Sequence, residues 1–488
     1  MNKKNLSDII SNTGGQLLTI TIIIILFGSL NLLMPIEVTG IGAILATLTL
    51  SYVLIQHRLT EKRHHMIIMI IWPVLMGCLL AWGGWRVWAG KLDLVSYLFV
   101  LPMALVFFQL LSTIPFAFYQ NHTAMDKWSP SESLPTVSVL IPAYNEEAYI
   151  SRTIESLLIT AYPENKLEII VIDDGSTDDT YQKARSYSSD RVRVFRKENG
   201  GKYSALNYGV MLSDSEVIVT IDADSIVGSN AIKDIVEPLQ ADSNVGAVAS
   251  DVQILNQNNH ITKMQALEYS VGINLIRRMF DWFSGVPVVP GCLGAFRRSA
   301  LEEVSNYDPD TLTEDYDLTL KVLKAGYDVR ASTALVYTEA PDTWRSLYKQ
   351  RIRWYRGNVE THLKHSTVIF KPEYDILHTV TLPLRMVTMT IGPLTTGLVI
   401  FTIAITIAGG SIYSVISIFT VFIMINAFST LLALQFKGNG FSLIMYTVAL
   451  STLYKLFRDV VTIQSVVDVL LRSNLSWTSP TRIRNREK

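Results

Sequence analysis

The sequence predicts an α/β domain built on an open, doubly wound sheet and set between two blocks of membrane-spanning helices. Three observations carry this prediction. Long apolar runs lie at both ends of the 488-residue chain, and between them short Val- and Ile-rich runs alternate with helical stretches. The composition agrees, because 49% hydrophobic residues are too many for an ordinary soluble enzyme, while 17% charged residues are too many for a pure membrane bundle.

The amino-terminal membrane block is predicted to cover residues 1–120. A bilayer-spanning helix needs roughly 20 mostly apolar residues. Four candidate spans lie near 17–34, 36–55, 66–82 and 94–119. The first run is too long for the apolar part of a cleavable signal peptide and is followed by further spans, so we expect it to be retained.

Positive charge predicts the orientation of these spans. Lys3, Lys4 and the basic loop 57–65 flank the first and second spans, and such residues favour the cytosolic side. Four spans return the chain to that side. We therefore expect a multi-pass protein of the cell membrane whose segment 121–375 faces the cytoplasm.

The cytosolic domain is predicted to cover residues 121–343. Its predicted strands are 136–142, 167–174, 191–195, 216–224 and 245–250. In a doubly wound sheet, ligands bind beyond the carboxyl ends of the strands. Polar clusters follow three of these strands, namely "PAYNEE", "DDGSTDDT" and "DADS". The motifs GxGxxG and GxxxxGK[ST] are absent, so dinucleotide and P-loop sites lack their phosphate cradles.

Two of these clusters have both a structural and a functional interpretation. "DDGSTDDT" suits a turn and a helix N-cap, or else Asp173 or Asp174 accepts a hydrogen bond from a base on which Tyr144 stacks. In "DADS", the two-residue period of a strand directs Asp222 and Asp224 to the same side. Such carboxylates suit Mg²⁺ or Mn²⁺, which would neutralise the charge of a departing diphosphate.

Basic residues and tryptophan occur in two further motifs. "NGGKYSALN" offers Lys202 as a phosphate contact or is a plain loop. "QRIRWYRGN" belongs to a predicted interfacial segment, 344–375, and is either a juxtamembrane anchor or part of the site. In the second case Arg353 would pair with diphosphate oxygens and Trp354 would provide a flat platform for a sugar ring.

Three acids, Glu314, Asp315 and Asp317, lie within "TLTEDYDLTL". A solvated helix face, a metal cage and a catalytic base are the alternatives for this cluster. Acids favour the first turn of a helix, and Gly326 is a natural C-cap for a helix that starts here.

The carboxyl-terminal membrane block is predicted to cover residues 376–488. Candidate spans lie near 379–407, 412–435 and 441–456, followed by an amphipathic helix and the basic tail "TRIRNREK". Three spans would leave this tail outside, against the positive-inside rule. Either the first region, which contains Pro383 and Pro393, folds as two passes or as an interfacial helix plus a pass, or the tail breaks the rule. The prediction is seven spans in all, give or take one.

The charge balance and the cysteines exclude other classes of protein. The net charge of −1 provides no basic field, so we expect no nucleic-acid partner. Cys78 and Cys292 lie far apart, so neither a disulfide framework nor a zinc site is readable.

In order along the chain, "PAYNEE", "DDGSTDDT", "GGKYSALN", "DADS", "PGCLGAFRR", "TED" and "QRIRW" resemble the membrane-embedded, processive members of glycosyltransferase family 2. That family includes the synthases of cellulose, chitin, hyaluronan and poly-N-acetylglucosamine. The resemblance covers about residues 135–360, and the tail "WTSPTR" is similar to the end of bacterial poly-N-acetylglucosamine synthases. It implies a GT-A fold, a UDP-sugar donor, Mg²⁺ or Mn²⁺, and inversion at the anomeric carbon.

The resemblance also implies a role for each matching residue. It implies that uridine is held by Tyr144, Glu146, Asp173 and Asp174, and that Lys202 contacts the diphosphate. It implies that Asp224 with Asp222 binds the metal and the donor, and that Asp315 is the catalytic base. The gate that binds diphosphate and acceptor would consist of Gln350, Arg353 and Trp354. A carboxylate within hydrogen-bond reach would take the proton of the acceptor hydroxyl as the new bond forms. Glu314 and Asp317 would orient the loop or cap the helix.

The resulting hypothesis is a processive hexosyltransferase that polymerises a UDP-sugar, foremost UDP-N-acetylglucosamine, into a β-linked polysaccharide and couples synthesis to export. Its expected partners are the UDP-sugar, the growing polysaccharide, the lipid bilayer and a small accessory membrane subunit. Four amino-terminal spans exceed those of familiar poly-N-acetylglucosamine synthases, which leaves the polymer open. The alternatives are single transfer to a lipid carrier, and a transporter or sensor with a degenerate nucleotide-binding domain.

Overall fold

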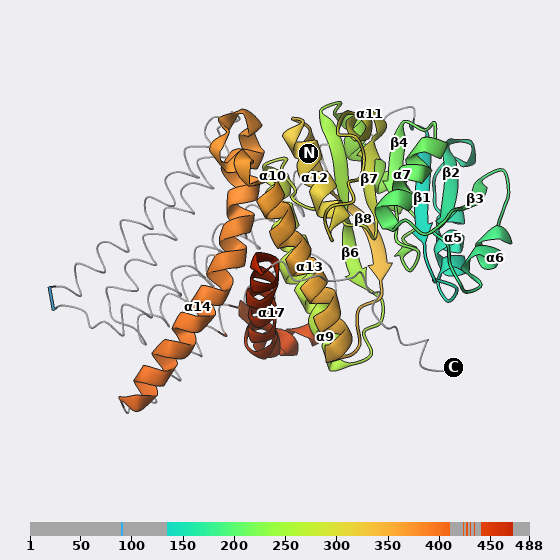
Figure 1. Cartoon of the computed structure of the whole chain (residues 1–488). Coiled ribbons are helices and arrows are strands. Elements are labelled where there is room, and N and C mark those ends of the chain that lie inside the picture. Colours follow the sequence, from blue (N-terminus) through green and yellow to red (C-terminus); the bar gives the residue numbers. More distant parts are fainter. Residues whose placement is uncertain are drawn as a thin grey trace, which may run out of the picture. The chain divides into compact units, whose positions relative to one another are not determined.

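The structure is a computed structural model that describes residues 89–90, 134–409, 423, 426–427, 430, 434 and 441–471 (Figure 1). The four amino-terminal spans, most of the span near 412–435 and the basic tail therefore lie outside the described residues. The chain divides into two units, one of Met1–Pro115 and Thr395–Ser429, the other of Phe116–Leu394 and Thr430–Lys488. The second unit contains the sheet and the candidate site.

An eight-stranded sheet in the order β3-β2-β1-β4-β7-β6-β8-β5 forms the centre of the second unit. Its strands are β1 (Val137–Ala143), β2 (Leu167–Asp173), β3 (Val192–Arg196), β4 (Val217–Thr220), β5 (Ile226–Val227), β6 (Val245–Ile254), β7 (Gly294–Arg297) and β8 (Asp328–Thr338). β1 pairs in parallel with β2 and β4, and β2 pairs in parallel with β3. β7 runs antiparallel to β4 and β6, β8 is parallel to β6, and β5 is antiparallel to β8. The sheet is therefore mixed, with a parallel half formed by β1 to β4.

Helices follow most strands of this sheet (Figure 1). The α-helices are α5 (Ile150–Leu158), α6 (Thr180–Arg185), α7 (Lys202–Leu212), α8 (Ala231–Ala241), α9 (His260–Glu268), α10 (Ile276–Trp282), α11 (Arg298–Glu303), α12 (Glu314–Lys324), α13 (Trp344–Lys364), α14 (Leu382–Ala408), α16 (Thr447–Ser451) and α17 (Leu453–Leu470). The 3₁₀ helices are η1 (Glu164–Lys166), η3 (Ser366–Phe370), η4 (Pro372–Tyr374) and η6 (Phe441–Tyr446), and the π-helices are η2 (Tyr269–Leu275) and η5 (Leu377–Thr381). Gly326 follows α12 with a φ of +90°, as expected for a glycine that ends a helix.

The five predicted strands are confirmed as β1, β2, β3, β4 and β6. Continuous Val and Ile runs form β1, β2 and β4, which are almost entirely buried because helices cover both faces of the sheet. Sequence reasoning missed β5, β7 and β8. The first has two residues, the second is "GAFR" without a run of β-branched residues, and the third mixes small, charged and apolar residues.

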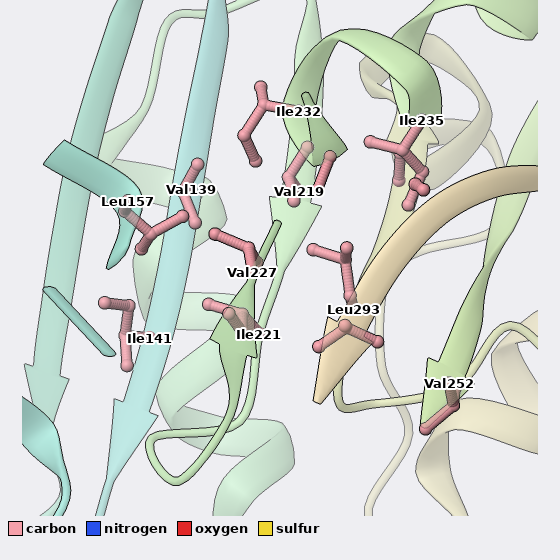
Figure 2. Packing of buried hydrophobic residues seen from close by; sticks show 14 of the residues in the cluster. Val139, Ile141, Leu157, Val219, Ile221, Val227, Ile232, Ile235, Val252 and Leu293 are labelled. Carbon is pink, nitrogen blue, oxygen red and sulfur yellow. The ribbon is translucent and has the colours of Figure 1, made fainter. Parts of the chain in front are cut away.

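The core between β1, β4 and α8 holds the strand ends in place (Figure 2). Val139 and Ile141 of β1, Val219 of β4, and Ile232 and Ile235 of α8 are all fully buried. Burying an aliphatic side chain of this size contributes about 1.5–3 kcal/mol to stability. The loops that follow β1 and β4 therefore start from a rigid base.

One prediction about β4 is wrong. The strand ends at Thr220, so Asp222 and Asp224 lie beyond it and are not aligned by the two-residue period of a strand. Instead they sit in a turn in which the Ser225 amide donates to the Asp222 carbonyl at 3.0 Å. A carboxylate-rich segment favours such a turn over a further strand residue, because aspartate is depleted in strands and favoured in turns.

The carboxyl-terminal block also differs from its prediction. Leu382–Ala408 is one continuous helix despite Pro393, so the division of the region 379–407 into two passes is wrong. The predicted span near 441–456 is instead η6, α16 and the start of α17. The break falls at Thr452, whose hydroxyl donates to the Val448 carbonyl at 2.6 Å, a bond that competes with regular helix geometry. Within the described parts of the chain, no helix has both the length and the apolarity needed to cross a membrane.

Candidate active site

A pocket lies at the carboxyl ends of β1 and β4, the edge at which the sequence places its polar clusters. It is lined by Pro142, Lys202, Leu206, Thr220, Ile221, Val289, Gly291, Phe296, Tyr307, Glu314 and Asp315. Polar groups from α7, from α12 and from the loop before β7 thus converge on a site whose remaining walls are largely apolar. Such a combination is typical of a small-molecule site.

Lys202 stands at the centre of this pocket. It is the first residue of α7 and follows Gly201, whose φ of +87° is a conformation that favours glycine. Its Nζ atom lies 2.7 Å from Oδ1 of Asp222 and 3.0 Å from Oε1 of Glu314. Burial alone would lower the pKa of Lys202, but the charges of Asp222, Glu314 and Asp315 hold it well above its usual value. Lys202 is therefore a fixed positive charge, as a diphosphate contact requires.

Asp315 lies at the start of α12 and faces the same pocket. Its Oδ1 accepts a hydrogen bond from the Tyr316 amide at 2.8 Å, and its Oδ2 accepts one from the Gly291 amide at 3.3 Å. Burial, and then the charge of Glu314, raise the pKa of Asp315 to about 6, although Lys202 opposes the rise. A carboxylate with such a pKa is still ionised at neutral pH and is a better proton acceptor than an ordinary aspartate.

The predicted metal ligands, Asp222 and Asp224, both lie near the pocket. The carboxylate of Asp222 is paired with Lys202, and Asp224 is buried. The pKa of the nearby Cys292 thiol is raised mainly by burial and then by the charges of Asp222 and Asp224, so both carboxylates act on the same small region. Two hard oxygen donors near the pocket are a donor set that fits Mg²⁺ or Mn²⁺.

A second acidic group, Asp308, Asp310 and Asp317, offers carboxylate oxygens that all lie within 4.8 Å of one another. The sequence offered a metal cage as one alternative for Glu314, Asp315 and Asp317, but it did not point to this group. Lys364 Nζ donates to all three carboxylates at 2.8 to 2.9 Å, so a lysine already compensates their charge.

The aspartates predicted to hold uridine, Asp173 and Asp174, pair with basic side chains of the loops beside the pocket. Asp174 accepts hydrogen bonds from the Gly200 amide at 3.1 Å and the Gly201 amide at 2.8 Å, and it pairs with Lys197 at 2.7 Å. It therefore fixes the glycine loop that leads to Lys202. Asp173 is fully buried and lies 3.1 Å from Nε of Arg196, and neither of its oxygens accepts a hydrogen bond from the residues that the structure describes.

Tyr144 and Glu146 follow β1 in a loop that is hydrogen-bonded to "DDGSTDDT". Asn145 between them has a φ of +57°, and its side chain accepts a hydrogen bond from the Thr177 amide at 2.8 Å. The Glu146 amide donates to Oγ1 of Thr180 at 2.7 Å. The structure thus brings the two predicted nucleotide loops together, and the uridine contacts themselves stay a prediction.

The predicted gate residues lie on α13. Gln350, Arg353 and Trp354 share one helix face, because residues three and four apart are neighbours on a helix. Gly357 continues this face, and a Cβ atom there would lie 2.6 Å from Cγ2 of Thr313. Thr313 directly precedes the first residue of α12, so this face of α13 passes close to the segment that carries Asp315.

Sequence reasoning missed the residue that supports Trp354. Arg351 is 1% exposed, and its guanidinium lies 4.3 Å from the centre of the Trp354 ring. Glu268, from α9, accepts hydrogen bonds from Arg351, from the Tyr454 hydroxyl at 2.7 Å and from Arg458 at 3.1 Å. Only the position of Arg351 inside "QRIRW" pointed to it, since its partners Glu268 and Tyr454 lie 83 and 103 residues away in the chain.

Gly291 of "PGCLGAFRR" was also missed as a site residue. Its amide donates to Asp315, and a Cβ atom at this position would lie 2.5 Å from Nζ of Lys202. A side chain at this position would therefore displace the Lys202 ammonium group from its observed place. The Pro-Gly turn was visible in the sequence, but its contacts were not.

The geometry agrees with the comparison with known sequences. Residues 138–305 match the sequence profile described as "Glycosyl transferase family 2". This segment is therefore similar to glycosyltransferase family 2 domains. The match includes "DDGSTDDT", "GGKYSALN" and "DADS", while "TED" and "QRIRW" lie beyond its end.

Curated proteins with similar sequences include a probable glycosyltransferase and polysaccharide synthases. The chain is 33% identical over 262 residues to "Probable glycosyltransferase YdaM" of Bacillus subtilis, covering 50% of this chain and 60% of the relative. It is 29% identical over 276 residues to "Poly-beta-1,6-N-acetyl-D-glucosamine synthase" of Staphylococcus epidermidis, covering 55% of this chain and 66% of the relative. The Staphylococcus aureus synthase of the same name is 32% identical over 236 residues, with 48% and 57% covered. The chain thus spans about three fifths of the curated relatives it matches.

A solved structure shares the fold. The mannosyltransferase PcManGT of Pyrobaculum calidifontis, solved with GDP-Man and Mn²⁺, aligns with a TM-score of 0.53 at 20% identity and covers 78% of this chain and all of that one. This likeness confirms the predicted GT-A-like α/β glycosyltransferase fold.

Proposed function

We propose that the protein is a processive, inverting hexosyltransferase that adds N-acetylglucosamine from a UDP-sugar to the end of a β-linked polysaccharide. One observation carries this proposal. Lys202, Glu314 and Asp315 line one pocket at the carboxyl edge of the sheet, where a nucleotide-sugar site of a family 2 domain belongs, and Asp222 pairs with Lys202 there. The similarity to the staphylococcal synthases supports the choice of sugar and of a polymeric product.

The donor would lie across the loops that follow β1, β2 and β4. Asp173 or Asp174 would accept a hydrogen bond from the uracil ring, and Tyr144 would stack on that ring. Lys202 would turn from the carboxylates that now hold it toward the diphosphate. Asp224 with Asp222 would hold Mg²⁺ or Mn²⁺, whose charge would stabilise the leaving diphosphate.

The acceptor hydroxyl would meet Asp315. The carboxylate would take the hydroxyl proton while the acceptor oxygen bonds to the anomeric carbon and the bond from that carbon to the diphosphate oxygen breaks. Attack from the face opposite the leaving group inverts the anomeric configuration. Trp354 would support the acceptor sugar, and Arg353 and Gln350 would contact the diphosphate.

A position at the cell membrane, with the catalytic domain in the cytoplasm, belongs to this proposal. The apolar blocks at both ends of the sequence support it, as does the order of segments, because "QRIRW" directly precedes the second block. Product that leaves past Trp354 would then enter a membrane passage, and synthesis and export would be coupled. A small accessory membrane subunit would complete the assembly.

The test is to incubate the purified full-length protein in lipid with Mn²⁺ or Mg²⁺ and a panel of UDP-sugars, and to measure UDP release and product size. We expect release with UDP-N-acetylglucosamine and a product of many units. A product with a single added sugar would contradict processivity and favour transfer to a lipid carrier. Absence of UDP release with every donor would contradict the proposal as a whole.

A further inference from the structure

The first turn of α12 and the second half of α13 form a tightly fitted seam. Asp317, in α12, is 1% exposed, so its carboxylate cannot act as an exposed cap. Its Oδ2 accepts a hydrogen bond from Lys364 Nζ at 2.9 Å, and its Oδ1 lies 2.8 Å from Nε2 of His365. The Asp317 carboxylate therefore ties α12 to the end of α13, two residues away from Asp315.

A steric contact sits at the other end of the seam. A Cβ atom at Gly357 would lie 2.6 Å from Cγ2 of Thr313, 2.7 Å from its Oγ1 and 3.0 Å from its backbone nitrogen. Contacts this short do not occur between real atoms without a shift of one element. The two helices thus reach their observed separation only because residue 357 has no side chain.

Further contacts lie between these two. The Tyr316 hydroxyl is 2.9 Å from Nε2 of His362, and the Thr313 and Thr361 hydroxyls are 3.4 Å apart. The side of α12 that carries Asp317 is therefore held at several points along two turns of α13. A helix is a stiff element, so these contacts also fix Gln350 and Trp354 earlier on α13.

We propose that Asp317 and Gly357 are positioning residues that set the distance between the Asp315 carboxylate and the Gln350–Trp354 face of α13. The inference rests on the proposed function, in which these two groups act on the same acceptor sugar. Neither positioning residue touches substrate. A displacement of about 1 Å at a reacting group can cost roughly 10²-fold in rate, so a loosened seam should lower turnover without weakening donor binding.

The first experiment compares Asp317→Asn with Asp310→Asn in the full-length protein in lipid, with Mn²⁺ and UDP-N-acetylglucosamine. Asp310 contacts the same Lys364 but is 56% exposed, which makes it a matched control. We expect Asp317→Asn to lower kcat by about 10- to 100-fold, on the scale of a misplaced reacting group, while the donor Kd and the number of donor sites stay unchanged. Asp310→Asn should keep the wild-type kcat.

The second experiment tests the steric contact between Gly357 and Thr313 instead of a charge. Gly357→Ala should lower kcat in the same way, because the new methyl group displaces α13 from Thr313. Thr313→Ala removes the two side-chain atoms that this methyl would meet, so the double variant Thr313→Ala/Gly357→Ala should regain most of the lost rate. If Gly357→Ala lowered kcat only because less protein folds, the Thr313→Ala change would not be expected to restore the rate.

Several outcomes would overturn the inference. A wild-type kcat in Asp317→Asn would exclude a positioning role, and an equal fall in kcat and in donor-site number would show that Asp317 only supports folding. A double variant no better than Gly357→Ala would exclude the steric role. If the wild-type protein releases no UDP from any UDP-sugar, the proposed function fails and this inference fails with it. If the wild type is active, the variants test the positioning role independently of the proposed function.

Discussion

The parallel half of the sheet and the half that follows it build their parts of the site in different ways. On the side that the proposed function gives to the donor, β1 to β4, short loops hold each other through hydrogen bonds close to the strand ends, as between the Thr177 amide and the Asn145 side chain. On the acceptor side, the side chains sit on α12 and α13, and buried charges hold these helices. The Arg351–Glu268 pair joins residues 83 apart, and the Asp317–His365 pair joins residues 48 apart.

This difference has a consequence for the effect of mutations. Loop hydrogen bonds near a surface can be replaced by water at modest cost, whereas a buried charge that loses its partner is strongly destabilising. We therefore expect the donor half to tolerate substitutions outside its site residues and the acceptor half to respond strongly to single changes. The predictions below test this contrast.

The largest effect is expected for Asp315→Asn. Asparagine keeps the shape of the side chain but cannot take a proton, so the rate of transfer should fall by roughly 10²–10⁴-fold, the usual contribution of general-base catalysis. UDP-sugar affinity should change little, because the predicted donor contacts lie on other loops. Turnover and donor Kd, measured on the same preparation, check this, and a variant with the wild-type rate would return Asp315 to the role of a helix cap.

The next largest effect is expected on stability for Glu268→Gln. Arg351 and Arg458 share the carboxylate of Glu268, and leaving buried charges without their counter-charge costs about 3–5 kcal/mol. The midpoint of thermal unfolding should fall clearly. Because Arg351 stacks on Trp354, the product should also become shorter even where donor hydrolysis persists.

The same pair predicts a dependence of stability on pH. Burial alone would raise the pKa of Glu268, but Arg351 and Arg458 more than reverse this and lower it. A carboxyl group whose pKa is lowered on folding contributes stability above its unfolded pKa, about 4.3, and loses it as the pH falls further. Wild-type protein should therefore lose stability below about pH 4.3 more steeply than Glu268→Gln, and parallel curves would contradict the pairing.

A smaller effect is expected from the titration of Asp315. With its pKa raised to about 6, the base is protonated below that pH, so kcat/KM should fall on the acid side of 6 and level off above it. Glu314→Gln removes one of the charges that raise this pKa and should move the acid limb to lower pH. A profile that is flat between pH 5 and 8 would exclude Asp315 as the base.

The sequence predicted the donor half well and the acceptor half incompletely. Continuous Val and Ile runs predicted β1, β2 and β4, and turn residues predicted the loops that carry Asp174 and Lys202, because both signals are local. The residue types in "TED" and "QRIRW" were visible, and the pocket confirms that Asp315 and Lys202 lie together. Partners such as Glu268 for Arg351 were not predictable, since no local pattern links residues so far apart. The same limit explains why Asp317 was taken for a loop or cap residue.

The smallest effect is expected for an ion pair on the donor side, Arg191–Glu164. Its two charged atoms lie 3.2 Å apart, close to the pair at Glu268, but the Glu164 side chain is 81% exposed. Water already solvates this carboxylate, so the loss of its charge should cost little, because pairs with a solvent-exposed member contribute only about 0–1 kcal/mol. Glu164→Gln should therefore keep the wild-type unfolding midpoint, turnover and product length within error, under the same conditions in which Glu268→Gln loses stability. If both variants were destabilised equally, burial would not be what separates the two halves, and the contrast between loop-held and charge-held parts of the site would have to be abandoned.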